Sequence, residues 1–169
     1  KACSVCPAGS VSTKAGQSLC DTCQSGYIPD GTNGCIACKE GTMQIQTLCV
    51  ACPPGQASNG TASIACYPCE AGKYAVLSGP SGAGCHDCPT GQVSSSGASV
   101  CKKCPTGQYA SSDSSQCIDC KPGQYSDNTE GADSCELCGA GKFSARYGAI
   151  TCTSCRAGTF TSDAGMTAC

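Results

Sequence analysis

Apolar side chains occur singly along this chain, separated by stretches of Ser, Thr, Gly, Asn and Asp. No segment repeats its apolar positions with the helical period over eleven residues. The pattern predicts short extended pieces of three or four residues, joined by turns, which form a small two-stranded ribbon in each of a series of units. We therefore expect little or no helix.

The apolar positions recur together with the cysteines, which form ten C-x-x-C pairs from Cys3–Cys6 to Cys152–Cys155. Successive pairs start 14 to 19 residues apart, and Cys169 begins an eleventh pair. A repeat of this length predicts units that contact only their neighbours, and hence an elongated, solenoid-like rod without a central core. The predicted repeats span residues 3–19, 20–34, 35–48, 49–65, 66–84, 85–100, 101–116, 117–134, 135–151 and 152–169.

Glycine recurs at two fixed places in the repeat. A glycine three residues after the second cysteine of every pair indicates a backbone position with φ > 0 or a close approach of two chain segments. An apolar residue two positions later is expected to cover its own disulfide and to contact the neighbouring repeat. In six repeats a second glycine, four residues before the next pair, predicts a second turn. The first set is Gly9, Gly26, Gly41, Gly55, Gly72, Gly91, Gly107, Gly123, Gly141 and Gly158, and the second is Gly16, Gly31, Gly97, Gly131, Gly148 and Gly165.

Composition explains how such a chain could fold. Leu, Ile, Val and Phe number 18 of 169 residues, well below the roughly 20% typical of chains that fold around large buried side chains. The 21 cysteines are instead typical of a disulfide scaffold in an oxidising compartment. One bridge that closes a loop of about 15 residues stabilises the fold by roughly 3 kcal/mol in the chain-entropy model.

The number of cysteines favours one pairing scheme without fixing it. If the second cysteine of each pair bonds the first of the next, twenty cysteines are used, and only Cys3 is left without a partner in this sequence. Linking first to first and second to second would leave Cys169 without a partner, and bridges inside each C-x-x-C would constrain almost nothing. The sequential scheme pairs Cys6–Cys20, Cys23–Cys35, Cys38–Cys49, Cys52–Cys66, Cys69–Cys85, Cys88–Cys101, Cys104–Cys117, Cys120–Cys135, Cys138–Cys152 and Cys155–Cys169.

The pattern C-x-x-C-P-x-G-x-Y, as in Cys101–Tyr109, resembles the ephrin-receptor-like cysteine-rich repeat and is similar to modules of tumour-necrosis-factor receptors. The resemblance covers the whole chain and implies a local bridge that agrees with the sequential scheme. It also implies a module found in receptors, adhesins and large surface proteins of protists and algae, so it leaves the function open. The proline is replaced in six repeats, by Gln24, Lys39, Glu70, Lys121, Gly139 and Arg156.

Several kinds of chemistry fit the sequence poorly. The cysteine pairs resemble a four-cysteine zinc site, but the spacing does not group into fours, and a redox C-x-x-C needs a helix N-terminus. A catalytic His86 would need a nucleophile and an orienting group in a pocket, and a chain without a core predicts no pocket, so His86 is expected in an exposed loop. The acids Asp127, Glu130 and Asp133 lack a calcium-loop pattern. We predict neither cofactor, metal site nor enzymatic activity.

The sequence favours an extracellular or cell-surface location. The net charge of −2 and the scattered Lys and Arg argue against nucleic-acid binding, and no apolar stretch is long enough for a membrane helix. The start inside the repeat pattern suggests a processed or truncated protein. Asn59-Gly60-Thr61 is an N-glycosylation sequon and is expected on a surface loop.

Two functions from different classes remain open. The uniformity of the repeats favours a structural role in an extracellular filament, stalk or coat, such as a flagellar hair, whose partners would be further copies or other surface glycoproteins and their glycans. The alternative is the ligand-binding ectodomain of a receptor or adhesin. For either, the longest loop supplies the candidate contact residues Tyr74, Val76, Leu77 and Pro80.

Overall fold

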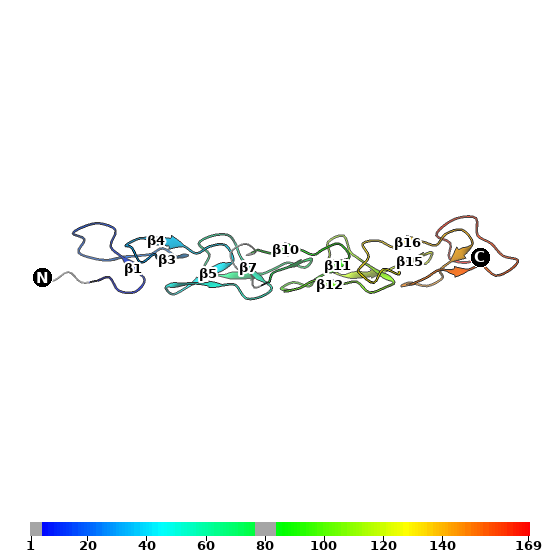
Figure 1. Cartoon of the computed structure of the whole chain (residues 1–169), viewed down its shortest axis with the longest axis horizontal. Helices are drawn as coiled ribbons and strands as arrows, with labels where there is room; N and C mark the ends of the chain where they lie inside the picture. The colour runs from blue at the N-terminus through cyan, green and yellow to red at the C-terminus, as the bar shows by residue number, and fades with distance from the viewer. Residues whose placement is uncertain (1–4, 77–83) are drawn as a thin grey trace. The chain divides into compact units, whose positions relative to one another are not determined.

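The computed structural model of the chain describes residues 5–76 and 84–169. In these residues, eighteen short strands pair into nine antiparallel hairpins and no helix forms, which confirms the predicted ribbon architecture (Figure 1). The hairpins are β1 (Ser10–Val11) with β2 (Asp21–Thr22), β3 (Tyr27–Pro29) with β4 (Cys35–Ala37), β5 (Thr42–Ile45) with β6 (Leu48–Ala51), β7 (Gln56–Ser58) with β8 (Cys66–Pro68), β9 (Lys73–Tyr74) with β10 (His86–Asp87), β11 (Gln92–Val93) with β12 (Lys102–Lys103), β13 (Gln108–Ala110) with β14 (Cys117–Asp119), β15 (Gln124–Tyr125) with β16 (Glu136–Leu137), and β17 (Lys142–Phe143) with β18 (Thr153–Ser154).

A tight turn begins every hairpin, and its third residue is the first of the two recurring glycines, here called the turn glycine. All ten turn glycines have φ between 75° and 89°, as the third position of a type II turn requires. The first residue of the turn contributes only its carbonyl, which accepts a hydrogen bond from the residue after the glycine. Pro105 accepts it from Gln108 at 3.1 Å and Lys121 from Gln124 at 3.0 Å. Proline is therefore dispensable at this position.

A disulfide closes each of the ten loops. The bonded cysteines are those that the sequential scheme pairs, with Cα–Cα distances of 5.4 to 5.8 Å, within the usual range for disulfides. In all nine hairpins the N–H of the second cysteine of the following pair also donates to the carbonyl of the turn glycine, as in Cys120 to Gly107 at 2.8 Å. The hairpins thus join each sequence repeat to the first four residues of the next. Cys3 lies outside the described residues.

The described chain forms two compact parts. The N-terminal part comprises the residues up to Cys69 and those from Ala75 to Cys85, and the C-terminal part comprises Glu70–Tyr74 and His86–Cys169. Within each part, contacts link a repeat to the repeats one and two further along, as expected for a repeat array.

Hydrogen bonds connect one repeat to the next through one position, the third residue after the turn glycine, here called the junction residue. In five repeats the N–H of the turn glycine donates to the carbonyl of the next repeat's junction residue, as in Gly107 to Ser126 at 2.7 Å and Gly123 to Ser144 at 2.7 Å. In two others the N–H donates to the junction side chain, Gly26 to Gln44 and Gly41 to Ser58. The N–H of Ser126 in turn donates to the Ala149 carbonyl of the following repeat at 3.0 Å. Each junction residue of this kind therefore bonds the repeats on both sides of it.

The turn glycine also lies against the repeat two positions further along. A methyl group placed on Gly107 would come within 2.3 Å of the Gly148 carbonyl oxygen, and one on Gly123 within 2.1 Å of the Gly165 carbonyl oxygen. These partners are glycines of the second set, all six of which have positive φ, as predicted for a second turn. Where this second glycine is replaced by Ala62, the alanine keeps the left-handed conformation, with φ of 58°.

Small side chains and disulfides fill the interior. The junction residues of repeats 4 to 10 are all buried, and so are the second cysteines of six pairs. No aliphatic side chain larger than Val11 is buried among the described residues, so the interior has no conventional core. The buried junction residues are Ser58, Ala75, Ser94, Ala110, Ser126, Ser144 and Thr161, and the buried cysteines are Cys38, Cys52, Cys69, Cys104, Cys120 and Cys138.

Three glycine-to-alanine substitutions distinguish the two reasons for glycine at the turn position, the positive φ and the close contact with another repeat. Gly139 precedes a turn glycine and serves as the control. Gly139→Ala should be nearly neutral, since no atom lies within 4 Å of the added methyl and φ is not positive. Gly141→Ala should destabilise by about 1 kcal/mol or more through its φ of 77° alone. Gly107→Ala should cost more, because it adds the clash with Gly148. Thermal unfolding with intact disulfides measures the loss of stability in each variant. Equal losses for Gly107→Ala and Gly141→Ala would contradict this account, because they would show that the contact with Gly148 adjusts to the added methyl group without cost.

Two buried serines at equivalent junction positions should respond differently to alanine. The Ser94 hydroxyl donates to the Lys73 carbonyl at 2.8 Å, whereas the Ser126 hydroxyl has no hydrogen-bond partner within the described part of the chain. Ser94→Ala should therefore lower the stability by about 1 kcal/mol, and Ser126→Ala should leave it unchanged or raise it. Differential scanning calorimetry of both variants measures the contrast, and a larger loss for Ser126→Ala would contradict this account.

Candidate interaction surface

Each hairpin carries two kinds of cross-strand pair, one on each face. In β7–β8 the junction residue Ser58 pairs with Cys66, and Ala57 pairs with Tyr67. Because side chains alternate along a strand, Ser58 and the first cysteine share one face while Ala57 and Tyr67 share the other. We call the second kind of pair the outward pair. The apolar residue after the turn glycine therefore lies on the face opposite its own first cysteine. It is nevertheless buried at Val11 and Ala57, and Ala57 clusters with Cys69 and Ala75 of the next repeat, so the predicted contact with the neighbouring repeat is confirmed there.

Exposure differs between the two strands of the outward pair. The first-strand residue is buried at Val11 and Ala57 and half-buried in the other seven hairpins. The outward-pair residue on the second strand is exposed in eight of the nine hairpins and half-buried at Ile118. The second-strand residue is consequently free to vary without disturbing the interior. The exposed members are Asp21, Ile36, Val50, Tyr67, His86, Lys102, Glu136 and Thr153.

The outward pairs of three consecutive hairpins in the N-terminal part are entirely apolar. They are Ile28 with Ile36, Met43 with Val50, and Ala57 with Tyr67. The β5–β6 hairpin is also the longest and adds a second apolar pair, Ile45 with Leu48, on the face of Met43 and Val50. No charged residue occurs between Glu40 and Glu70, so these segments present an uncharged surface.

Charged and hydrogen-bonding groups dominate the outward pairs of the C-terminal part. The Tyr125 hydroxyl donates to the Glu136 carboxylate at 2.7 Å, and this bond raises the pKa of the Tyr125 phenol above its usual value. Beside the Tyr74–His86 pair, Lys73 donates to Asp87 at 2.5 Å, which raises the pKa of Lys73 and lowers that of Asp87. All these groups are solvent-exposed or half-buried, so the ion pair contributes little to stability.

The predicted contact loop is only partly described. Tyr74 is half-buried, and its ring centroid lies 5.9 Å from that of His86. Val76 is partly exposed, and Leu77 and Pro80 lie outside the described residues. Sequence reasoning missed the apolar outward pairs of repeats 2 to 4, although the charge-free stretch between Glu40 and Glu70 could have drawn attention to them.

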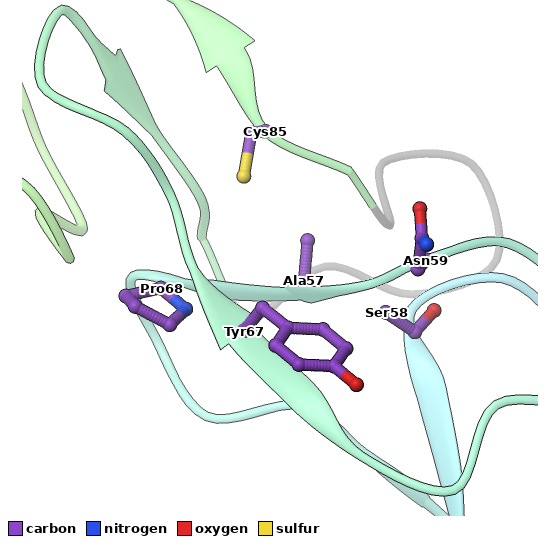
Figure 2. A pocket seen from close by; sticks show the side chains of 6 residues that line it. All are labelled: Ala57, Ser58, Asn59, Tyr67, Pro68 and Cys85. Atoms are coloured by element: carbon purple, nitrogen blue, oxygen red, sulfur yellow. The ribbon is translucent and has the colours of Figure 1, made fainter.

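A shallow pocket of about 310 Å³ lies on the N-terminal part (Figure 2). It is lined by Ala57, Ser58, Asn59, Tyr67, Pro68 and Cys85. Figure 2 shows the Tyr67 ring extending from β8 away from Pro68, toward the side on which Ser58 lies. None of these lining residues is an acid, a base or an activated nucleophile, so the pocket lacks the groups of an active site. Asn59 of the sequon is exposed at this pocket.

The cysteine sulfurs are occupied by disulfides, which settles what they can bind. Twenty cysteines are oxidised, so they provide no thiolates for zinc or for redox exchange. Within residues 5–76 and 84–169, no three His, Cys, Asp or Glu side chains are grouped to hold a metal ion. The same residues provide no helix long and apolar enough to cross a membrane.

Comparison with known proteins identifies the type of repeat. Residues 107–151 match the family described as tyrosine-protein kinase ephrin type A/B receptor-like. The matched segment includes the outward pairs of β13–β14 and β15–β16 and the turn glycines Gly107, Gly123 and Gly141. No curated protein matches the chain. This match and the ten tandem disulfides fit a cysteine-rich ephrin-receptor-like repeat, a type typical of extracellular domains.

Proposed function

Because the chain is a cysteine-rich repeat array that fits the ephrin-receptor-like type, we propose that it is a non-enzymatic structural element of an extracellular filament, stalk or surface coat. The observation that carries the proposal is the use of backbone groups between repeats. In both parts, turn glycines donate to the following repeat: Gly55 bonds Ala75 at 2.8 Å and Gly141 bonds Thr161 at 3.0 Å. Such a connection resists local opening, because separating two repeats leaves buried backbone groups without partners.

The ten local disulfides support the same role. Each disulfide closes one short loop, so a cut or a local unfolding event in one repeat leaves the other nine loops closed. The interior contains few large side chains, so the loss of one side chain would disturb few other repeats. These are properties that a protease-resistant spacer needs, whereas a ligand-binding ectodomain would need a distinct recognition patch on a few repeats.

Electron microscopy of the purified full-length protein tests the structural role. We expect filaments or sheets in which the arrays lie in regular lateral contact, because the outward faces are available for association. Soluble monomers that bind one protein ligand tightly and never assemble would contradict the proposal and favour a receptor or adhesin. Peptide mapping without reduction should recover the ten local disulfides from the same material.

We also propose that Asn59 carries an N-linked glycan. Its side chain is exposed one residue after β7, and the sequon threonine, Thr61, is exposed as well. Protein secreted from eukaryotic cells should lose the mass of an oligosaccharide on enzymatic deglycosylation, and Asn59→Gln should abolish that loss. An unchanged wild-type mass would contradict occupancy of this site.

A further inference from the structure

The longest hairpin of the array presents a continuous strip of large aliphatic side chains. Met43, Ile45, Leu48 and Val50 lie on one face of β5–β6, because Met43 pairs with Val50, Ile45 pairs with Leu48, and alternate residues share a face. Leu48 is 64% exposed, Ile45 45% and Val50 38%. We call these four residues the aliphatic strip.

The disulfide of this hairpin and the hydrogen bonds of the Gln44 side chain lie on the opposite face. There the Gln44 carboxamide accepts from the Gly26 N–H at 2.5 Å and donates to the Tyr27 carbonyl at 2.8 Å. Cys49 of the same face bonds Cys38, which is fully buried. The backbone N–H of Gln44 also donates to Ser63 of the next repeat at 2.8 Å. The neighbouring repeats therefore bind the hairpin through this face. Ile45, Leu48 and Val50 of the aliphatic strip remain exposed on the other face.

The chain segment that contains the aliphatic strip is uncharged, and the adjacent hairpins add exposed apolar side chains. No Lys, Arg, Asp or Glu occurs from residue 41 to residue 69. The preceding hairpin adds Ile36, which is 50% exposed, and the following hairpin adds Tyr67, which is 58% exposed. The C-terminal part differs, since its outward pairs include Lys102, Glu136 and His86. The apolar outward surface is thus concentrated in repeats 2 to 4.

We propose that the aliphatic strip is a lateral contact between two copies of this chain. An acidic or basic partner would find no counter-charge here, whereas two neutral aliphatic strips match each other and do not repel. A two-stranded ribbon offers much less than the roughly 800 Å² per partner of a stable interface, so a single pair of strips associates weakly. In a fibre, each chain makes several such contacts at once, so the overall affinity exceeds that of a single contact.

This inference deepens the proposed structural function and rests on it. It identifies the repeats through which copies associate and predicts that charge in this one place prevents association. The outward pairs of the C-terminal part are not required for it. The contact is apolar, so it should weaken little when salt is added, in contrast to an association through exposed ion pairs.

A matched pair of lysine substitutions tests the aliphatic strip. Leu48 and Val100 each precede the first cysteine of a pair and are similarly exposed, at 64% and 58%. Leu48→Lys should raise the self-dissociation constant at least roughly tenfold, because a charge must be buried in the contact, whereas Val100→Lys should leave it unchanged. Sedimentation equilibrium across a wide concentration range measures both, in an Asn59→Gln background that removes glycan heterogeneity. Thermal unfolding checks that both variants remain folded.

The possible outcomes separate this inference from the function it rests on. Filaments that persist in Leu48→Lys as in Val100→Lys would overturn the aliphatic strip as the contact and leave the structural function standing. A wild-type protein that stays monomeric and forms no filaments would overturn both. Binding of the wild type, but not of Leu48→Lys, to neutral phosphatidylcholine vesicles without any self-association would assign the strip to a lipid surface instead and would also overturn the inference.

Discussion

The backbone of the turn glycine holds each repeat in place within the array. At Gly107 the carbonyl accepts from Cys120 inside the hairpin, and the N–H donates to Ser126 of the next repeat. Its Cα faces the Gly148 carbonyl two repeats further along. A positive φ is needed to direct these groups in three ways at once, and a side chain would block the third contact. Together, the two requirements admit glycine alone.

This constraint explains why the array needs so few large side chains. Repeats that approach each other backbone to backbone leave room only for small residues, so Ala and Ser occupy most of the buried junction positions. The free energy gained by burying apolar surface is correspondingly small. The disulfides stabilise the fold instead, because they limit the conformational entropy of the unfolded chain. The low content of Leu, Ile, Val and Phe is therefore a consequence of the close repeat spacing.

Folding and surface chemistry are separated in this design. The inner face of each ribbon carries the disulfide and the junction residue, which every repeat needs. The exposed second-strand residue of the outward pair contributes little to either. The pair is apolar in β3–β4, β5–β6 and β7–β8, whereas in β11–β12 and β15–β16 it includes the charged side chains of Lys102 and Glu136. A uniform scaffold can thereby present different surfaces along its length, which suits an assembly whose contacts are confined to chosen repeats.

The sequence by itself determined the period of the array, the position of the turn glycines and the absence of helix, because these depend on local backbone conformation and on cysteine spacing. It also favoured the cysteine pairs that the structure joins, since short loops leave few choices. Only the tertiary structure decided which side chains face inward. The strand register placed the apolar residue at Ala57 on the face opposite the first cysteine, and the packing of the repeats buried the junction residues Ser94 and Ser126. Successive side chains of a strand point to opposite faces, so a shift of one residue in the strand register would exchange the two faces. The spacing of residues along the chain does not determine the register, and therefore could not predict which side chains face inward.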